Sequence, residues 1–415
     1  MPFHITGLIS LAMLAILKVA PFKQIIVHGF GSDTVAFFIG ILALSSCMGI
    51  SGLTNRFAGL LLRLTKGNTK KLIFGVLVLG MLLGMWLTTL AAAAIITLII
   101  MPMVEKGNMQ KGDVGAKALV ISIAWGSLIG GIASPAGSGA NPILISFAST
   151  MLDIDISFIQ WMMFGIPCAI ALIPPAYIIL TRFYPPKETL FLSDDTQTEK
   201  TPLSKNEKSA SIIFSLVILT WLFSKKISGI IGVDIPTSLP ALIGACAFFL
   251  PGVSDIKWKD VEERISWSSI LLIASSISLG MLLYETGAAA WLAQILFSDI
   301  KNLHPILLMI VVSISISLIK LGLSSNTVTA TVVVPVLIAI AKQQGIESIL
   351  LLLPCAMSMN NAYILVTSTP TSIIPYSYGY FSIADMAKPG VIITICSAVI
   401  SASVLYLIMQ LSGMI

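Results

Sequence analysis

The chain has 415 residues, of which 56% are hydrophobic and 10% are charged, and its mean hydropathy is +0.98. A soluble protein of this length has no interior large enough for so much apolar surface. The composition therefore excludes that class and predicts an all-α polytopic membrane protein. The formal net charge of +5 comes from lysines in the loops and does not indicate a nucleic-acid partner.

Two apolar segments, 72–104 and 304–342, are too long for one straight crossing, which takes about 20 residues. Each has a polar interruption near its centre. A segment of this kind is expected to fold as a hairpin that enters and leaves the membrane from the same side.

Two further segments, 117–148 and 348–378, are also too long for one crossing. They are interrupted midway by Ser134–Pro142 and by Thr367–Ser372. These interruptions predict two discontinuous helices. The other apolar segments are 5–21, which we interpret as a retained helix rather than a signal peptide, 34–53, 156–181, 209–224, 236–251, 267–296 and 389–412.

One polar stretch divides the chain, and it carries both signs of charge and Pro185-Pro186. We interpret 182–208 as a cytoplasmic linker between a first repeat, 1–181, and a second repeat, 209–415. Each repeat contains membrane segments, then a hairpin, a broken helix and a final helix. Interrupted segments in matching places are typical of inverted-repeat secondary transporters, whose site lies at the repeat interface.

Lysines and arginines are concentrated in every second loop between membrane segments. This distribution predicts the orientation of the chain in the membrane. These residues are dense between Arg56 and Lys71, between Lys106 and Lys117, and between Lys257 and Arg264. Because positive residues favour the cytoplasmic side, the amino terminus is predicted to be cytoplasmic and the carboxyl terminus outside. The first hairpin then opens from the cytoplasm and the second from outside, so the halves are inverted.

The stretch Lys320–Thr331 places uncharged hydrogen-bonding residues in the middle of the second hairpin. Ser and Asn compete for backbone hydrogen bonds and interrupt a helix. Irregular polar backbone at membrane depth is tolerated where protein buries it or where it lines a wet cavity. Two interpretations stay open from these residues alone: a binding site, or a kinked loop whose polar groups satisfy each other.

Several motifs in order resemble the divalent anion:sodium symporter (DASS) family, which carries di- and tricarboxylates or sulfate. Ser325-Asn326-Thr327, followed by Val-Thr-Ala-Thr, is similar to the family's Ser-Asn-Thr hairpin signature. The stretch from Thr367 to Gly379 resembles its second helix break. The likeness extends over nearly the whole chain, with further matching stretches at Gly130–Asn141, Ile156–Pro167, Trp267–Gly280 and Ile383–Gly390.

The resemblance implies Na⁺-coupled transport of a small anion by elevator-like movement of a homodimeric protein. It also implies the site residues. Substrate contacts fall on Asn326, Thr327, Thr369, Pro370, Thr88 and Thr89, and Na⁺ contacts on Ser325, Asn326, Ser368, Thr88, Thr89 and Gly137. Na⁺ is the expected coupling ion, and no other cofactor is expected.

The chain departs from the family pattern at the first hairpin tip. It has Met85-Trp86-Leu87-Thr88-Thr89-Leu90 where the family has Met-Trp-Ile-Ser-Asn-Thr. Thr371 and Ser372 likewise replace a Pro and an Asn in the second helix break. Family members usually have two further amino-terminal helices, so we expect this chain to begin at the family's third. The altered tip favours an alternative function as a dicarboxylate exchanger or a carrier of sulfate or another anion.

Physical chemistry favours the same site without the resemblance. Helix N-termini at hairpin tips and helix breaks present unpaired N–H groups to carboxylate oxygens. Carbonyl groups freed at the breaks, together with Ser and Thr hydroxyls, can coordinate Na⁺. A membrane-embedded enzyme would need titratable groups converging near the breaks, and the sequence has few of them there. A channel would not need paired inverted hairpins.

Four polar features leave alternatives open. Lys320 could stand in for a coupling cation or pair with the substrate, or it could simply reach the vestibule or a carbonyl group. Glu285 could serve proton coupling or end a half-helix. Asn360-Asn361 could bond between helices or line the pathway. The tryptophans could form a ligand cage, but an interfacial belt explains them better: Trp125, Trp161, Trp221, Trp258, Trp267 and Trp291.

Overall fold

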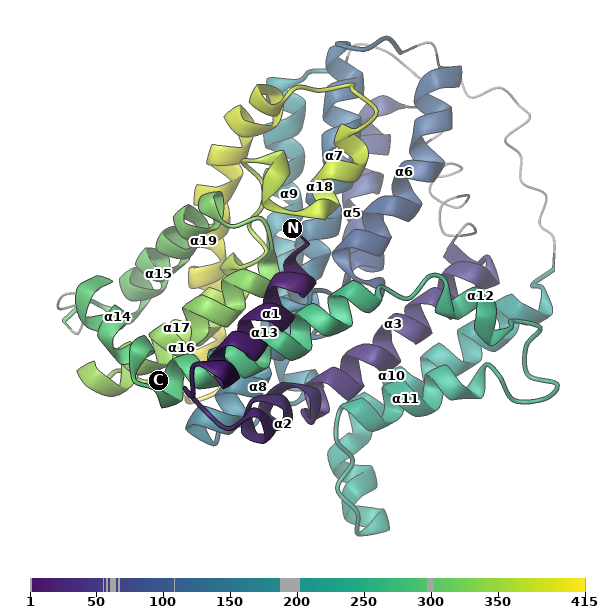
Figure 1. The fold of residues 1–415 in the computed structure, drawn as a ribbon. Helices are drawn as coiled ribbons and strands as arrows, with labels where there is room; N and C mark the ends of the chain where they lie inside the picture. Colours follow the sequence, from purple (N-terminus) through teal and green to yellow (C-terminus); the bar gives the residue numbers. More distant parts are fainter. Residues whose placement is uncertain are drawn as a thin grey trace.

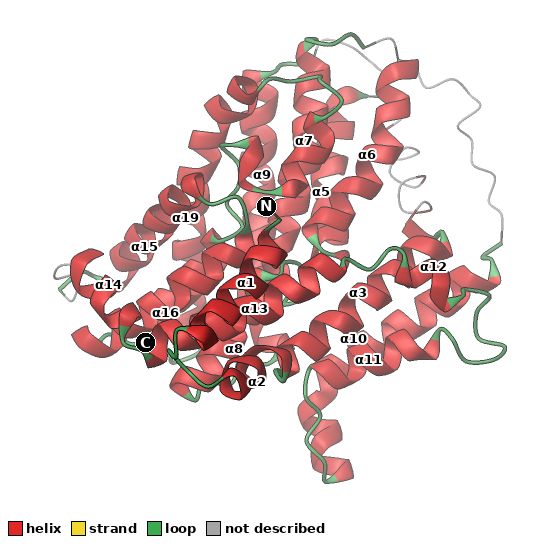
Figure 2. Cartoon of the chain, in the orientation of Figure 1, coloured by secondary structure: helices red, strands yellow, loops and turns green. Residues whose placement is uncertain are grey.

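The computed structural model describes residues 2–54, 56, 59, 65, 68–107, 109–186, 202–296 and 302–414. These residues form helices joined by loops (Figure 1, Figure 2). Within the described ranges, nine helices are long and apolar enough to cross a membrane. The prediction of an all-α polytopic membrane protein is therefore confirmed.

The helices before the polar linker run from α1 to α9. Their bounds are α1 Phe3–Ile16, α2 Phe22–Phe30, α3 Asp33–Ser51, α5 Thr69–Leu87, α6 Thr89–Lys106, α7 Val114–Ala133, α8 Ala140–Leu152 and α9 Phe158–Phe183. Those after it are α10 Lys205–Ile231, α11 Ser238–Ala247, α12 Trp258–Glu262, α13 Trp267–Glu285, α14 Ala288–Leu296, α15 Pro305–Ile319, the 3₁₀ turn η2 Lys320–Gly322, α16 Asn326–Gln344, α17 Ile349–Ser358, the 3₁₀ turn η3 Val366–Ser368, α18 Pro370–Tyr376 and α19 Ile383–Leu411.

Both predicted hairpins form. In the first, α5 and α6 meet at Thr88, whose side chain accepts a hydrogen bond from the N–H of Ala91 and caps α6. In the second, α15 ends in the turn η2, and Ser325 caps α16 through the N–H of Val328. The two hairpins approach each other from opposite ends of the molecule (Figure 1). This inverted arrangement agrees with the predicted repeats.

Both predicted helix breaks also form. A loop of six residues, 134–139, separates α7 from α8, and a longer loop containing η3 separates α17 from α18. Each break follows a hairpin in sequence and packs near a hairpin tip. The loops expose backbone N–H and C=O groups inside the protein, where such groups must find partners.

Glycines bring the first hairpin close to the first broken helix. Gly80 and Gly84 on α5 face Gly126 and Gly130 on α7, with a spacing of four residues on each helix. A Cβ atom at Gly130 would lie 2.4 Å from the carbonyl oxygen of Met81, so a side chain there would force the helices apart. Small residues at this spacing let membrane helices pack at short range. The pairing fixes the tip of the hairpin against the break.

The first apolar segment is shorter than predicted. We expected one helix over 5–21, but α1 has 14 residues and ends at Ile16. This length is below the roughly 20 residues of a straight crossing. Pro21 disfavours helical backbone in the preceding residue, and Lys18 has a φ of 59°, so the chain turns and begins again as α2.

Three tryptophans do not belong to the expected interfacial belt. Trp125, Trp161 and Trp221 are at most 2% exposed. The indole N–H of Trp161 donates to the carbonyl of Ile132 near the end of α7, and the ring of Trp221 stacks on Phe158 at 4.0 Å. Buried rings with such partners are core residues. Trp258, Trp267 and Trp291 are exposed, as a belt requires.

The predicted linker 182–208 lies partly outside the described residues, because 187–201 are not among them. α9 ends at Phe183 and α10 begins at Lys205, four residues before the predicted start of the second repeat. The division of the chain into these repeats at this linker stays a prediction.

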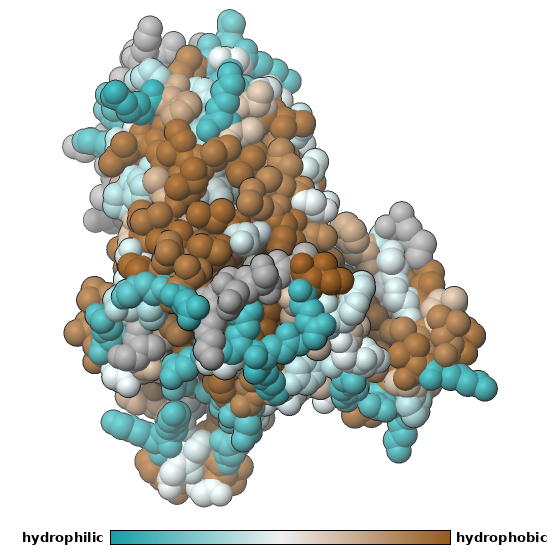
Figure 3. Space-filling model, turned by 90° about the vertical axis from the view of Figure 1, so that its left-hand side faces the viewer, coloured by the Kyte–Doolittle hydropathy of each residue, from teal (hydrophilic) through white to brown (hydrophobic). Residues whose placement is uncertain are grey.

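Apolar side chains also cover much of the outer surface. Hydrophobic residues gather over a broad area with hydrophilic residues above and below it (Figure 3). On α10, Ile212 and Leu216 are 60% and 57% exposed. Exposed aliphatic side chains in such number fit contact with lipid.

Candidate functional site

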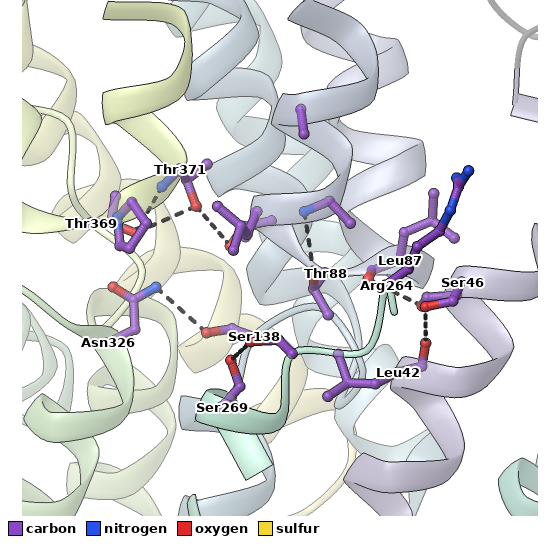
Figure 4. Close-up of a pocket in the computed structure, with 18 of the residues that line it drawn as sticks. Leu42, Ser46, Leu87, Thr88, Ser138, Arg264, Ser269, Asn326, Thr369 and Thr371 are labelled. Carbon is purple, nitrogen blue, oxygen red and sulfur yellow. Dashed lines mark hydrogen bonds between the residues drawn. The ribbon is translucent and has the colours of Figure 1, made fainter. Parts of the chain in front are cut away.

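The tips of both hairpins face one cavity of about 850 Å³ (Figure 4). Residues from α3, the α5–α6 tip, the loop before α8, the start of α13, the α15–α16 tip and α18 form its wall. The two repeats therefore contribute to a single site.

Four helices begin at the wall of this cavity. Their N-cap residues are Thr88 for α6, Gly139 for α8, Ser325 for α16 and Thr369 for α18, and all four line the cavity. The first N–H groups of a helix have no acceptor within the helix, and the macrodipole places partial positive charge there. α18 has only seven residues, so α6, α8 and α16 contribute most. These helix ends therefore favour an anion in the cavity without a dense set of charged side chains.

The capping bonds at the cavity are long. The N–H groups of Ala91, Val328 and Thr371 each lie 3.4 Å from the hydroxyl oxygen of their N-cap residue. Typical N–H···O distances are 2.7–3.2 Å, so these bonds are weak. An anion in the cavity could compete for the same N–H groups.

The structure brings most of the predicted site residues to the cavity. Those that line it are Thr88, Thr89, Ser325, Asn326, Thr327, Thr369 and Pro370. Gly137, Ser368 and Lys320 do not line the cavity, but each makes a hydrogen bond with a lining residue or with another of the three. They lie directly behind the wall.

A chain of buried amides supports the second hairpin tip. The amide N–H of Asn326 donates to the side-chain oxygen of Asn360 at 2.8 Å, and Asn360 donates to Asn141 at 3.4 Å. Asn141 in turn donates to the backbone carbonyls of Gly131 and Ser134, at 2.7 and 2.8 Å. The chain thus connects the second tip with both broken helices. In a low-dielectric interior, a network whose members are all paired rigidifies its surroundings.

Lys320 ends this network on its other side. Its ammonium nitrogen donates to the side-chain oxygen of Asn326 at 2.5 Å and to the carbonyl oxygen of Ser368 at 3.3 Å. The residue is only 1% exposed. Of the two non-functional alternatives, Lys320 therefore pairs with a carbonyl group and does not reach an aqueous vestibule. A functional role as a substitute cation stays a prediction.

The first hairpin tip has hydroxyl groups in place of amides. The Thr371 hydroxyl donates to the Thr89 hydroxyl at 3.1 Å, and Thr369 lies 3.4 Å from Thr371 (Figure 4). The N–H of Thr89 donates to the carbonyl of Gly137 at 2.9 Å. The tip of the first hairpin is thus bonded to the broken helices of both repeats.

Glycines let the wall close around these tips. A Cβ atom at Gly131 would lie 2.4 Å from the methyl group of Thr89 and 3.2 Å from the side-chain oxygen of Asn360. A Cβ atom at Gly139 would lie 2.9 Å from the Thr327 hydroxyl. At both positions a larger residue would displace a side chain of the site.

Sequence reasoning did not single out several lining or supporting residues. Asn141 lies within the interruption Ser134–Pro142, and a polar amide at this place in the sequence could have indicated a site residue. Ser138 is 3.5 Å from the amide nitrogen of Asn326 (Figure 4). Arg264, an exposed residue in the loop before α13, is the charged residue among the described residues that line the cavity. No sequence motif around Arg264 indicates that it lines the cavity.

Two open alternatives are resolved. Asn361 bonds between helices, because it donates to Ser317 on α15 at 3.2 Å and accepts from Ser397 on α19 at 2.9 Å. Glu285 is the last residue of α13, where it contacts His28 at 3.1 Å. It is exposed at a helix end, as the second interpretation held, but α13 has 19 residues and is long enough to cross the membrane, so it is not a half-helix.

Comparison with known proteins identifies the family. The family model described as "Sodium:sulfate symporter transmembrane region" matches residues 1–412. The chain belongs to the DASS family. The sodium-dependent dicarboxylate transporter SdcS of Staphylococcus aureus (strain USA300) is 26% identical over 434 residues, covering 99% of this chain and 82% of that protein. An uncharacterized transporter of Haemophilus influenzae is 27% identical over 411 residues, covering 97% of this chain and 87% of that protein.

A solved structure supports the fold. The crystal structure of the Alcanivorax borkumensis YdaH transporter is similar with a TM-score of 0.57 and 14% identity, covering 99% of this chain and 97% of that chain. At this identity the likeness shows the fold alone. Family and relatives together establish this DASS member as an integral membrane protein and a secondary active transporter of anions.

Proposed function

We propose that this protein takes up a small di- or tricarboxylate together with Na⁺. The substrate binds in the cavity between the hairpin tips and contacts Asn326, Thr327, Thr369, Pro370, Thr88 and Thr89. The single observation that carries the proposal is the convergence of four helix N-termini on one cavity. Such ends bind carboxylate oxygens, and a cavity shared by two repeats can hold two carboxylates at once.

Two places that flank the cavity are proposed as cation sites. One is lined by Thr88, Thr89 and Gly137, and the other by Ser325, Asn326 and Ser368. The carbonyl of Gly137 and the hydroxyls of the first tip are neutral oxygen ligands, which suit a hard cation. The name of the S. aureus relative, which describes sodium-dependent transport of dicarboxylates, supports this coupling.

Movement of the site between two sides is proposed to be elevator-like. A second cavity of about 800 Å³ lies elsewhere along the same two helices. α3 contributes Phe38 to the first cavity and Thr34 to the second, and α13 contributes Ile273 and Ile277 in the same way. Alternating access exposes one site to each side in turn, and a second cavity along the same helices supports a path for that movement.

Orientation and assembly complete the proposal. The charge asymmetry of the loops supports a cytoplasmic amino terminus and an external carboxyl terminus, and the bacterial relatives support a bacterial inner membrane. A homodimer is proposed on the family resemblance.

A second candidate function is exchange of dicarboxylates without a coupling cation. The observation that favours it is the ammonium group of Lys320 beside Asn326, since a fixed cation makes a bound one less necessary. Transport of sulfate is a third candidate, favoured by the replacement of the expected Asn by Thr89 at the first tip.

The deciding experiment is uptake of labelled succinate into proteoliposomes, with and without an inward Na⁺ gradient. Uptake that requires Na⁺ and falls at least about tenfold in Asn326→Ala would support the proposal, because that variant loses a substrate donor and breaks the amide chain. Uptake only into vesicles preloaded with dicarboxylate would favour exchange. Inhibition by sulfate but not by citrate or fumarate would change the substrate class.

A further inference from the structure

We propose that the ammonium group of Lys320 permanently occupies the cation site of the second repeat, so that Na⁺ enters the first-repeat site but not this one. The inference rests on the proposed function, because it concerns which of the two cation sites is open. It gives the protein a built-in positive charge beside its substrate cavity.

The contacts of Lys320 carry the proposal. Its nitrogen is bonded to the side-chain oxygen of Asn326 and to the carbonyl oxygen of Ser368, at 2.5 and 3.3 Å. Both residues are proposed ligands of the second Na⁺. Neutral amide and carbonyl oxygens are also the acceptors that a Na⁺ ion would take. The ammonium and the ion therefore compete for the same oxygens.

The local backbone directs the lysine into this position. α15 ends at Ile319, and the turn η2 folds Lys320–Gly322 back toward the tip. The side chain then reaches Asn326, six residues later, and Ser368 in the second helix break. A lysine one helical turn earlier on α15 would start about 5 Å farther from the tip.

Burial makes the charge significant. Lys320 is 1% exposed, and within the described residues no carboxylate lies within ion-pair distance of it. A buried ammonium without an anionic partner is costly. The cavity lies on the other side of Asn326, whose amide oxygen faces the lysine. An anionic substrate in the cavity would supply the missing negative charge, so the lysine favours the loaded state.

Three substitutions separate occupation of the site from a structural role. Lys320→Ala removes the charge and leaves space for Na⁺. Lys320→Met removes the charge but fills much of the same space with an apolar chain. Lys320→Thr leaves space for Na⁺ and adds a hydroxyl oxygen as a ligand. It replaces Lys320→Ala in the experiment if the alanine variant does not fold. Lys342→Gln is the matched control, because it removes a charge from the same hairpin at the far end of α16, where Lys342 contacts Met151.

The first readout is succinate uptake at increasing Na⁺. The alanine or threonine variant should lose uptake at low Na⁺ by at least about tenfold and recover at high Na⁺ with a steeper Na⁺ dependence. Methylammonium should also restore its uptake at low Na⁺. The methionine variant should recover with neither cation, and Lys342→Gln should follow the wild type. Equal losses in all Lys320 variants, without rescue, would show that the lysine has a structural role and overturn the proposal.

The second readout does not need transport. The rise of the unfolding temperature with NaCl, compared with choline chloride, is measured for each purified protein without substrate. Lys320→Ala or Lys320→Thr should gain more stabilisation from Na⁺ than the wild type and Lys320→Met, because a ligand that binds the folded state stabilises it. Equal Na⁺ stabilisation in all of them would overturn the inference. If the wild type transports no carboxylate, the proposed function is wrong. The comparison of unfolding temperatures still tests the role of Lys320, because it needs no transport.

Discussion

The two hairpin tips occupy matching places in the two repeats, yet they hold their surroundings by different chemistry. The second tip is connected to a chain of three amides and to a lysine. The first is connected to threonine hydroxyls and a backbone carbonyl. Amides have fixed donors and acceptors and impose one arrangement, whereas hydroxyls rotate and can change partners. We infer that the second tip is a rigid half of the site and the first an adaptable half.

The largest expected effect comes from breaking the rigid half at its centre. Asn360→Leu leaves the side-chain oxygen of Asn141 without its partner and the amide nitrogen of Asn326 with only the long 3.5 Å bond to Ser138. We expect a loss of about 1–3 kcal/mol in unfolding free energy and at least a tenfold fall in uptake. Thermal unfolding in detergent and proteoliposome uptake measure the two effects.

The neighbouring amide provides the control for this variant. Asn361→Leu removes bonds to Ser317 and Ser397, which do not contact the tips. It should cost comparable stability but retain most of the uptake. If both variants lower uptake equally, the amide chain has no special part in binding.

A smaller effect is expected from the adaptable half. Thr371→Val keeps the shape of the side chain but removes the hydroxyl that donates to Thr89. The Na⁺ concentration for half-maximal uptake should rise about 3–10-fold, in line with the loss of one neutral hydrogen bond. Thr394→Val, which removes a hydroxyl bonded within α19, should leave this concentration unchanged. If the Na⁺ concentration for half-maximal uptake is unchanged in Thr371→Val, the hydroxyl groups at the first tip do not contribute to Na⁺ binding.

The smallest effect is expected from a test of backbone strain at the two tips. Thr88 has a φ of 97°, which is strained for a β-branched residue, whereas Ser325 has a φ of −149°. Thr88→Gly should therefore raise the unfolding free energy by about 1 kcal/mol. Ser325→Gly should lower it by a few tenths, since a cap is lost without relief of strain. Changes of the same sign in thermal unfolding would contradict this difference between the tips.

The sequence predicted the hairpins and helix breaks well, because segment length and polar interruptions are local properties. Seven residues that the family resemblance implies for the site, between Thr88 and Pro370, also line the cavity. The sequence could not predict the amide chain. Asn141 and Asn360 are 219 residues apart, and their contact depends on how two broken helices pack. The contact of Lys320 with Ser368, 48 residues later, depends likewise on how the second tip packs against the second broken helix.

The bond between Thr371 and Thr89 joins residues that are 282 positions apart in the chain. During synthesis the first hairpin is complete long before its partner in the second helix break exists. Until then its polar tip depends on α7, α8 and water, because hydrocarbon offers no hydrogen bonds. Contacts this distant in sequence form slowly. The site is therefore expected to mature last, when nearly the whole chain has entered the membrane, and a truncated chain ending before Thr371 should insert its helices without assembling a working transporter.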